Sequence, residues 1–226
     1  MAITLSTGVS LQVAKTYGAS INTTAVSNAS TAVVTTASAH SISVGDYVEV
    51  SSGWGLLDKR IVRAGAGTTA STLYLEGIDT TSISKYPSGT GTGSVRKVTV
   101  WTALSQVKGL SASGGDMQFA NITAIDDVVA KQVPTIRNAV SMNIDVYDDP
   151  TLAWYSDVAT ASDARAPYGL LMAFPNDSKL VANAYWSLQR VPAVTINEAM
   201  TSQISLRRRG WTLRTSQQPC RSSRAS

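Results

Sequence analysis

The stretch that most constrains the fold of this chain is residues 39–98, where short apolar segments alternate with Gly-rich turns. The apolar segments lie near residues 44–48, 61–62, 73–75 and 95–98. Strand and turn signals that recur about every 8–12 residues are typical of a small all-β unit. The stretch therefore predicts a β module within a longer β-rich chain, and it favours a structural building block over a catalyst.

That module is predicted to be a small β-barrel formed by residues 33–99 and inserted into a larger domain. The larger domain would be discontinuous, with residues 1–32 before the insertion and residues 100–206 after it. Trp54 lies between two glycines in SSGWG, which leaves two interpretations open. An exposed Trp54 would belong to a partner surface, whereas a buried one would plug the end of the small barrel; we favour the plug.

The larger domain is predicted from strands with one apolar and one polar face. Apolar residues alternate with polar ones over 140–147, which indicates a half-buried strand. Residues 180–189 form a second strand of this kind, and Val194 and Ile196 are predicted to open a last one. The Gly-rich segment 111–115 is predicted to be a flexible loop.

One helix is predicted, from Pro150 to Ala164. Asp149 is a suitable N-cap, and proline at the first helical position loses no intrahelical hydrogen bond. Leu152, Tyr155 and Val158 then follow at helical spacing. The helix is long enough to flank a sheet.

The composition favours burial against other proteins. Charged residues make up 15% of the chain, against about 25% in typical globular proteins. The chain instead holds 29 Ser and 25 Thr residues. Hydroxyl surfaces cost less to desolvate than charged ones, and threonine favours strands. An ordinary soluble β protein is also compatible with this composition.

The net charge of +4 comes from the C-terminus. Residues 1–206 carry 13 basic and 15 acidic side chains, whereas residues 207–226 carry six arginines and no acid. This basic C-terminal arm is open to three interpretations. It could contact nucleic acid, it could contact a neighbouring subunit or solvent, or it could be a stretch outside the native reading frame.

No group of residues predicts catalysis, a metal site or a cofactor. The chain has one cysteine, Cys220, and one histidine, His40, which excludes zinc sites and nucleophilic dyads built from these residues. The acidic pairs 126–127 and 148–149 are better explained as a turn and a helix cap. No 18-residue apolar run is present and no signal peptide is visible, so we expect synthesis in a cytoplasm without membrane insertion.

Several segments together resemble the tail tube proteins (major tail proteins) of long non-contractile-tailed bacteriophages. They are AHSISVGDYVEV, SSGWGLLDKRIVR, TASTLYLEGIDTT, SVRKVTVWT and FPNDSKLVANAYWSLQRVP. The resemblance covers roughly residues 1–206, and the chain departs from it after Leu206. It implies a mainly β fold: a tail-tube β-sandwich with one flanking α-helix, plus an inserted small β-barrel of the SH3-like kind.

The same resemblance implies a structural virion protein that is no enzyme. Such subunits form hexameric rings that stack into a tube, and DNA passes through the central channel into the host cell. The implied partners are further copies of the chain, the tape measure protein, the tail terminator and the distal tail proteins. DNA would pass transiently and without sequence preference, and assembly would occur in the host cytoplasm.

Specific residues are expected to perform these roles. For the channel lining we expect the sheet of residues 117–126 and 136–147, with Gln118, Asn143 and Asp145 facing the lumen. Contacts between subunits are expected at three residues of the segment 111–115 and at three arginines of the C-terminal arm. These are Ser111, Gly114, Gly115, Arg207, Arg208 and Arg209.

The arginines are expected to point outward or into a seam between subunits, because cations in the channel would hold DNA. The small barrel is expected to project outward as an accessory. Two other functions remain open at this stage. One is a carbohydrate- or receptor-binding β module, and the other is a β-rich hydrolase with an unrecognised site.

Overall fold

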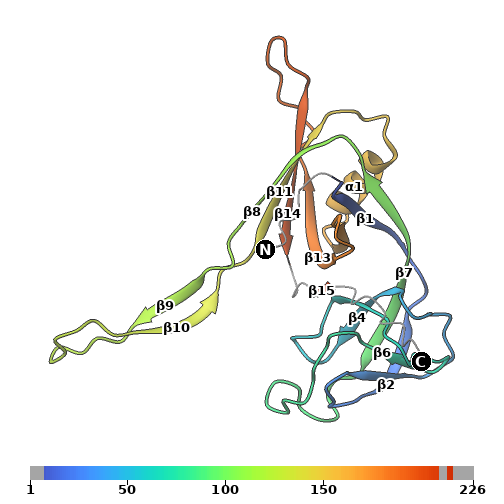
Figure 1. The fold of residues 1–226 in the computed structure, drawn as a ribbon, viewed down its shortest axis with the longest axis vertical. Helices are drawn as coiled ribbons and strands as arrows, with labels where there is room; N and C mark the ends of the chain where they lie inside the picture. The colour runs from blue at the N-terminus through green and yellow to red at the C-terminus, as the bar shows by residue number, and fades with distance from the viewer. Residues whose placement is uncertain (1–7, 209–212, 216–226) are drawn as a thin grey trace, which may run out of the picture.

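The computed structural model of the chain describes residues 8–208 and the backbone of residues 213–215 (Figure 1). This part of the chain holds fifteen β-strands and a single α-helix. The strands of the first half are β1 Ser10–Tyr17, β2 Ile21–Val26, β3 Val33–Thr36, β4 Tyr47–Ser52, β5 Arg60–Arg63, β6 Thr72–Tyr74 and β7 Gly93–Leu104. The remaining elements are β8 Val107–Ser113, β9 Met117–Asn121, β10 Gln132–Arg137, β11 Ser141–Tyr147, α1 Ala153–Asp163, β12 Pro167–Ala173, β13 Lys179–Leu188, β14 Thr201–Arg208 and β15 Leu213–Thr215.

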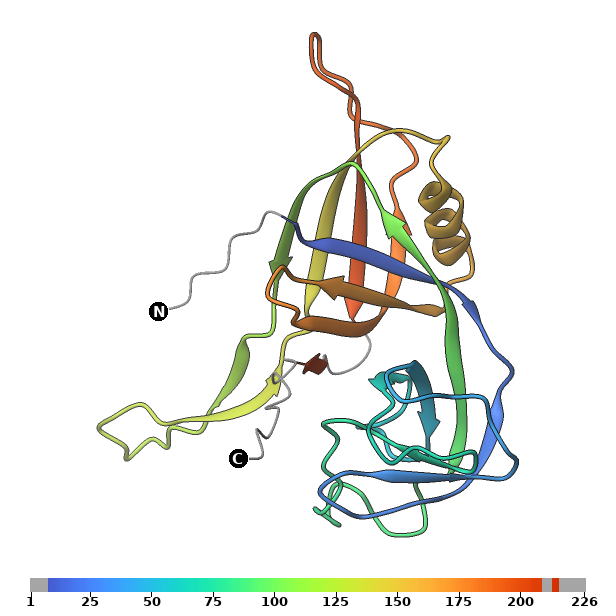
Figure 2. The ribbon, with the colours of Figure 1, turned by 45° about the vertical axis from the view of Figure 1, so that its right-hand side comes forward.

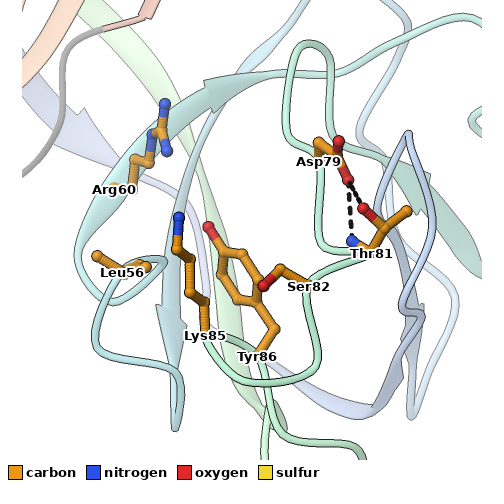
Figure 3. Close-up of a pocket in the computed structure, with 7 residues that line it drawn as sticks. All are labelled: Leu56, Arg60, Asp79, Thr81, Ser82, Lys85 and Tyr86. Carbon is orange, nitrogen blue, oxygen red and sulfur yellow. Dashed lines mark hydrogen bonds between the residues drawn. The ribbon is translucent and has the colours of Figure 1, made fainter.

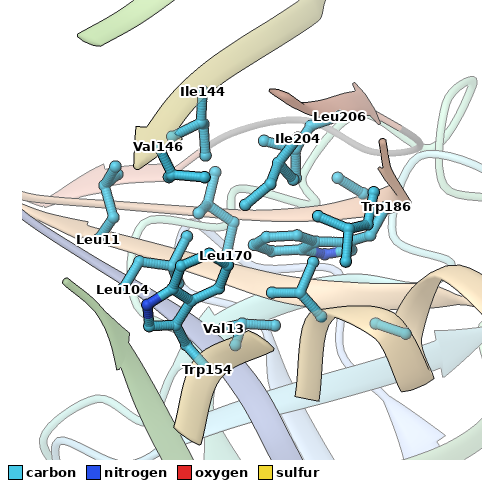
Figure 4. Close-up of a cluster of buried hydrophobic side chains, with 14 of the residues drawn as sticks. Leu11, Val13, Leu104, Ile144, Val146, Trp154, Leu170, Trp186, Ile204 and Leu206 are labelled. Atoms are coloured by element: carbon cyan, nitrogen blue, oxygen red, sulfur yellow. The ribbon is translucent and has the colours of Figure 1, made fainter. Parts of the chain in front are cut away.

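The larger domain is a sheet that folds back on itself around one core. Its strand order is β7-β1-β12-β13-β14-β11-β8, and each strand runs antiparallel to its neighbours in this order. Figure 2 shows β7, β1 and β12 facing the half formed by β14, β11 and β8, with α1 beside them. Buried apolar side chains from both halves and from the helix fill the space between, among them Val13, Leu170, Ile144 and Trp154 (Figure 4). The predicted mainly β fold, a sandwich with one flanking helix, is confirmed.

The helix begins later than the sequence predicts. Asp149 does not cap it, because its Oδ1 accepts hydrogen bonds from the N–H and the hydroxyl of Thr151, 3.0 and 2.6 Å away. These bonds hold residues 149–151 in a local turn that competes with helix formation. The helix starts after Leu152, whose backbone is extended and whose side chain forms no cap. One side of the helix is buried, and it carries Trp154, Val158 and Ala161.

A second, smaller β unit has its own core. Strands β3, β4, β5 and β6 and the first half of β7 surround buried side chains such as Val48, Leu73 and Val95. Trp54 is 2% exposed in this core, and its indole N–H donates to the carbonyl of Pro87 at 2.8 Å. Trp54 is therefore buried, as the plug interpretation requires, and does not belong to an exposed surface.

Strand β2 belongs with this smaller unit, although the sequence analysis grouped it with the larger domain. It pairs with β3 and with the first residues of β7, and Ile21 and Val26 pack against the second core. The 12-residue strand β7 then runs on from the small unit into the larger sheet, where it pairs with β1. One strand thus takes part in both units.

The two units share a buried junction. Tyr47 and Ile61 of the small unit pack with Leu171 and Val181 of the larger sheet, and Trp101 of β7 lies against them. The side-chain amide of Asn183 donates to the backbone carbonyl of Lys59 across the junction at 2.8 Å. Strand β13 is therefore buried on both faces over residues 181–184, since one face meets the main core and the other meets the small unit.

Two segments project from the larger domain. The hairpin β9–β10 extends beyond β8 and β11, and the loop of residues 189–200 extends from the end of β13 (Figure 1). The sequence predicted a strand at Val194 and Ile196, which is wrong: both side chains are exposed in the loop, and the strand begins at Thr201. Strand β14 then continues through Arg208, so the strand pattern does not stop at Leu206.

Candidate assembly surfaces

The outer face of β8, β11, β14 and β13 is a continuous polar surface. Cross-strand partners share a face of a sheet, and here Asn143 is opposite both Ser111 and Ser205, while Asp145 is opposite Gln203. We call this surface the polar face. It is formed by Ser111, Ser113, Ser141, Asn143, Asp145, Tyr185, Ser187, Gln203, Ser205 and Arg207.

Hydrogen bonds between neighbouring strands hold the polar face in place. The Ser205 hydroxyl donates to Asn143 Oδ1 at 3.1 Å, and Gln203 Nε2 donates to Asp145 Oδ1 at 3.0 Å. The intervening residues Ile144 and Val146 are fully buried in the core. The predicted alternation of strand 140–147 is confirmed, and it makes the polar face a hydroxyl and amide wall backed by an apolar core.

The charges on the polar face are balanced. Its ten side chains include one acid, Asp145, and one base, Arg207. Arg207 lies opposite Ser141, two residues along the strand from Ser205, so it shares the face with Asn143 and Asp145. If Asn143 and Asp145 line a lumen, Arg207 lines it with them. The expectation that Arg207 points outward or into a seam is incompatible with that arrangement.

The structure separates Gln118 from the two other residues expected in the lumen. Residues 117–126 do not form a sheet with β11, because β9 pairs with β10 alone in a two-stranded hairpin. There Gln118 Nε2 donates to Asn138 Oδ1 at 2.5 Å. The periodicity of the sequence identified the strands, but it did not show that the chain leaves the main sheet after Ser113.

Two glycines set the direction of this departure. Ser111 is part of strand β8, so segment 111–115 is not the predicted flexible loop; Gly114 and Gly115 both have φ values of +86° at the point where the hairpin bends. A Cβ atom on Gly114 would lie 2.2 Å from the carbonyl oxygen of Ala139. The Gly115 N–H donates to the Asn138 carbonyl at 3.2 Å, so the two chains stay paired through the bend. Left-handed backbone and close approach both require glycine here.

The hairpin beyond the bend, residues 116–138, carries many exposed apolar side chains, and we call it the arm. Each of eight large apolar residues is at least 40% exposed: Met117, Phe119, Ile122, Ile125, Val128, Val129, Val133 and Ile136. An isolated two-stranded hairpin is marginally stable in water. Exposed apolar residues at this density mark a surface that another protein covers.

The projecting loop of residues 189–200 shows the same property. Val191, Val194, Ile196 and Met200 are between 47% and 88% exposed. Neither apolar surface was predicted from the sequence, which placed residues 117–126 in the sheet expected to line the channel and Val194 and Ile196 in a strand. The sequence did contain a signal for the first of them: residues 117–137 carry apolar side chains on both faces, whereas a half-buried strand needs them on one face only.

The expected contact residues are spread over different places. Ser111 lies on the polar face and Gly114 and Gly115 form the bend of the arm. Arg208, opposite Ala184, projects to the other side of β14 from Arg207, and burial lowers the pKa of its guanidinium. Arg209 lies outside the described residues.

The candidate chemical groups named here are engaged in structural hydrogen bonds. Asp127 accepts from the Ala124 N–H at 2.9 Å and pairs with Lys131, while Asp148 accepts from the Ser202 hydroxyl at 2.7 Å. His40 Nδ1 accepts from the Ile42 N–H at 3.3 Å within its own turn. Across the described residues, no three His, Cys, Asp or Glu side chains converge as metal ligands, and no helix is long and apolar enough to cross a membrane.

Comparison with known proteins gives a family match over most of the chain. No curated protein sequence matches it. Two solved structures show limited similarity: the tube-terminating cap of the anti-feeding prophage, and its baseplate. The cap is 20% identical with a TM-score of 0.35, covering 47% of this chain and 79% of its own. The baseplate chain is 9% identical with a TM-score of 0.38, covering 53% and 86%.

The family model of the phage tail tube protein matches residues 52–216. It extends past Leu206, where the sequence analysis expected the likeness to end, and it includes strands β14 and β15. A polar face, an apolar arm and this match lead to one conclusion: the chain belongs to the phage tail tube protein family and is a structural component of a phage tail.

Proposed function

We propose that this chain is the repeating subunit of a tail tube, and that it self-assembles into hexameric rings that stack around a channel for DNA. The observation that carries this proposal is the arm. Eight exposed apolar side chains on an otherwise isolated hairpin are costly in a free subunit, at about 25 cal/mol per Å² of apolar surface left in water. Docking the arm on a second copy of the chain removes that cost.

The stacking of copies follows from the shape of the subunit. The arm and the loop of residues 189–200 leave the body at different places (Figure 1). Each surface contacts a different part of the next copy, which makes the interfaces heterologous. Heterologous interfaces form rings where the rotation closes and filaments where it does not. A tube of stacked rings contains both kinds of interface: those within a ring close, and those between rings continue along the tube.

The polar face is the surface we assign to the channel wall. Hydroxyl and amide side chains stay hydrated, and the balance of Asp145 against Arg207 leaves no net field to hold phosphates. Under this assignment Asn143 and Asp145 line the channel as the sequence analysis expected, and Arg207 lines it with them. Gln118 belongs to the arm and is assigned to contacts between subunits.

The test of assembly is electron microscopy of the purified chain together with sedimentation velocity. The double variant Phe119→Ser, Ile125→Ser removes two exposed apolar residues of the arm, and we expect it to remain monomeric where the native chain forms rings or tubes. Ile83→Ser is the matched control, because Ile83 is 67% exposed on the small β unit. Monomers of the native chain, or unimpaired tubes of the arm variant, would contradict the proposal.

The test of the channel assignment places a new cation on the polar face. Ser187 is exposed on β13, and Thr160 is exposed on the outside of α1. Tubes of Ser187→Lys should retain a short DNA duplex at low salt and release it at high salt, whereas tubes of Thr160→Lys should not retain it. Co-sedimentation of labelled DNA with the tubes measures this. Equal retention of DNA by both variants would contradict the assignment of the polar face to the channel wall.

A further inference from the structure

The small β unit contains a cavity whose lining residues all belong to one copy of the chain. Its volume is about 250 Å³, and it lies between the segment that leads into β5 and the segment 79–86. Figure 3 shows the side chains around it: the cationic groups of Arg60 and Lys85 lie on one side, and Asp79 and Thr81 lie opposite. The residues that line it are Leu56, Arg60, Asp79, Thr81, Ser82, Lys85 and Tyr86.

The cavity has an excess of positive charge. No ion pair in the described part of the chain includes Arg60 or Lys85. The Nε atom of Arg60 is buried without a hydrogen-bond partner. Burial lowers the pKa of its guanidinium; Tyr86 opposes this effect, and the charge of Arg208 adds to it. A buried donor atom without a hydrogen-bond partner is costly, and an anionic ligand that accepts from it would offset that cost.

The single acid of the cavity is already engaged. Asp79 Oδ1 accepts from the Thr81 N–H at 2.9 Å and from the Thr81 hydroxyl at 2.7 Å, and these bonds lower the pKa of Asp79. Asp79 therefore stays ionised and leaves a net charge of +1 among the lining residues. Its carboxylate, with the hydroxyls of Thr81 and Ser82, offers acceptors and donors opposite the two cations.

The apolar wall is fixed in place. Tyr86 is 8% exposed, and its ring meets the ring of Trp54 edge to face at 5.2 Å. The side-chain amide of Asn28 donates to the carbonyls of Thr80 and Tyr86 at 2.9 and 2.8 Å, which ties segment 79–86 to the unit. A preformed concave site with an aromatic wall and a few convergent polar groups is typical of a small-ligand site.

We infer that this cavity binds an acidic sugar, with the ligand carboxylate between Arg60 and Lys85 and its hydroxyls toward Asp79 and Ser82. A carboxylate pairs with a guanidinium through charge-assisted hydrogen bonds. The volume admits one sugar ring at a time rather than a long chain. The inference does not depend on ring assembly, because the cavity lies within one copy of the small β unit.

The test is saturation-transfer NMR on the full chain, a ligand-observed method that works on monomers and on tubes. Methyl glucuronide should receive saturation, and neutral methyl glucoside should bind at least tenfold more weakly. Lys85→Gln removes one cation at an exposed position and should weaken glucuronide binding at least tenfold. Lys108→Gln, which removes the same charge from β8, should leave binding unchanged. Arg60→Gln serves as a second variant, with its melting temperature measured in parallel.

Three results would overturn the inference. One is no saturation of methyl glucuronide at millimolar concentration, and another is equal binding of the glucuronide and the glucoside. The third is equal weakening in the Lys85→Gln and Lys108→Gln variants, which would show attraction by net charge alone. Binding of inorganic phosphate is followed in parallel by the broadening of its 31P signal: if phosphate binds while the glucuronide does not, the cavity is an anion site that does not recognise sugars.

Discussion

At the scale of single residues, the most constrained charge is the carboxylate of Glu49. It is 1% exposed, and its Oε2 accepts from Arg96 Nη2 at 2.7 Å and from Nε at 3.2 Å, while Lys59 Nζ lies 3.7 Å from Oε1. The Arg96 guanidinium also lies 4.0 Å from the centre of the Tyr17 ring. A buried carboxylate held by two cations is strongly dependent on both.

Glu49→Gln should therefore lower the free energy of unfolding by about 2–3 kcal/mol, because charge-assisted hydrogen bonds are lost in a buried site. Urea unfolding of the unassembled protein measures this. Glu76→Gln is the control, since Glu76 pairs with Arg63 at 3.1 Å where both side chains are more than a quarter exposed. That pair should contribute less than about 1 kcal/mol. Equal losses would show that burial of Glu49 does not matter.

Tyr17 gives a prediction for alkaline pH. Burial raises the pKa of its phenol from 10.0 to about 12, despite a hydrogen bond from the Gly169 N–H at 2.9 Å. Between these two values the unfolded chain loses the Tyr17 proton and the folded chain keeps it, so this contribution to stability is complete below pH 10 and declines as pH rises toward 12. Tyr17→Phe should reduce the slope of stability against pH in that range. An unchanged slope would contradict the assignment.

At the scale of elements, the sequence pattern was informative for strands with one buried face and misleading for exposed ones. The alternation in 140–147 placed Ile144 and Val146 in the core because a core exists on that side. Residues 117–137 carry apolar side chains that are exposed in the monomer, and the proposed function assigns them to contacts with a second copy. Local periodicity cannot distinguish burial within a chain from burial between chains.

The bend before the arm is testable at this scale. Gly114→Ala would place a Cβ against the Ala139 carbonyl and force a left-handed backbone on alanine, so the arm must change direction. We expect loss of tubes in electron microscopy with a melting temperature close to that of the native chain. Gly109→Ala is the matched control on β8, because its Cβ would meet nothing within 4 Å. Tubes from Gly114→Ala would show that the direction of the arm is not required.

At the scale of the whole molecule, the small β unit is attached more firmly than an accessory would need to be. The small barrel was expected from the sequence to be an accessory to the larger domain. The junction changes that expectation, because Leu171 is 6% exposed and Val181 is 2% exposed only while Tyr47 and Ile61 cover them. Deletion would open an apolar surface on β12 and β13.

The two units should therefore unfold together. Calorimetry of the unassembled chain should show a single transition, since β7 runs through both units and a buried junction joins them. Ile61→Ala creates a cavity at the junction and should lower the melting temperature of the whole chain rather than of one part. Two separate transitions in the native chain would show that the units are independent.

The sequence by itself indicated a mainly β chain with one helix, and it favoured a buried Trp54 over an exposed one. These expectations follow from local periodicity and turn residues, which act over a few positions of the chain, whereas the likeness to tail tube proteins rests on the segments that resemble that family. Tertiary structure alone decided that β9 and β10 leave the main sheet, that Arg207 shares a face with Asn143 and Asp145, and that Arg60 and Lys85 meet in one cavity. Cross-strand register and packing between distant segments set these features. The alternating strand and glycine-turn pattern of residues 39–98 thus predicts a β unit. Its junction with β13 and the charges in its cavity depend instead on tertiary packing between segments far apart in the sequence.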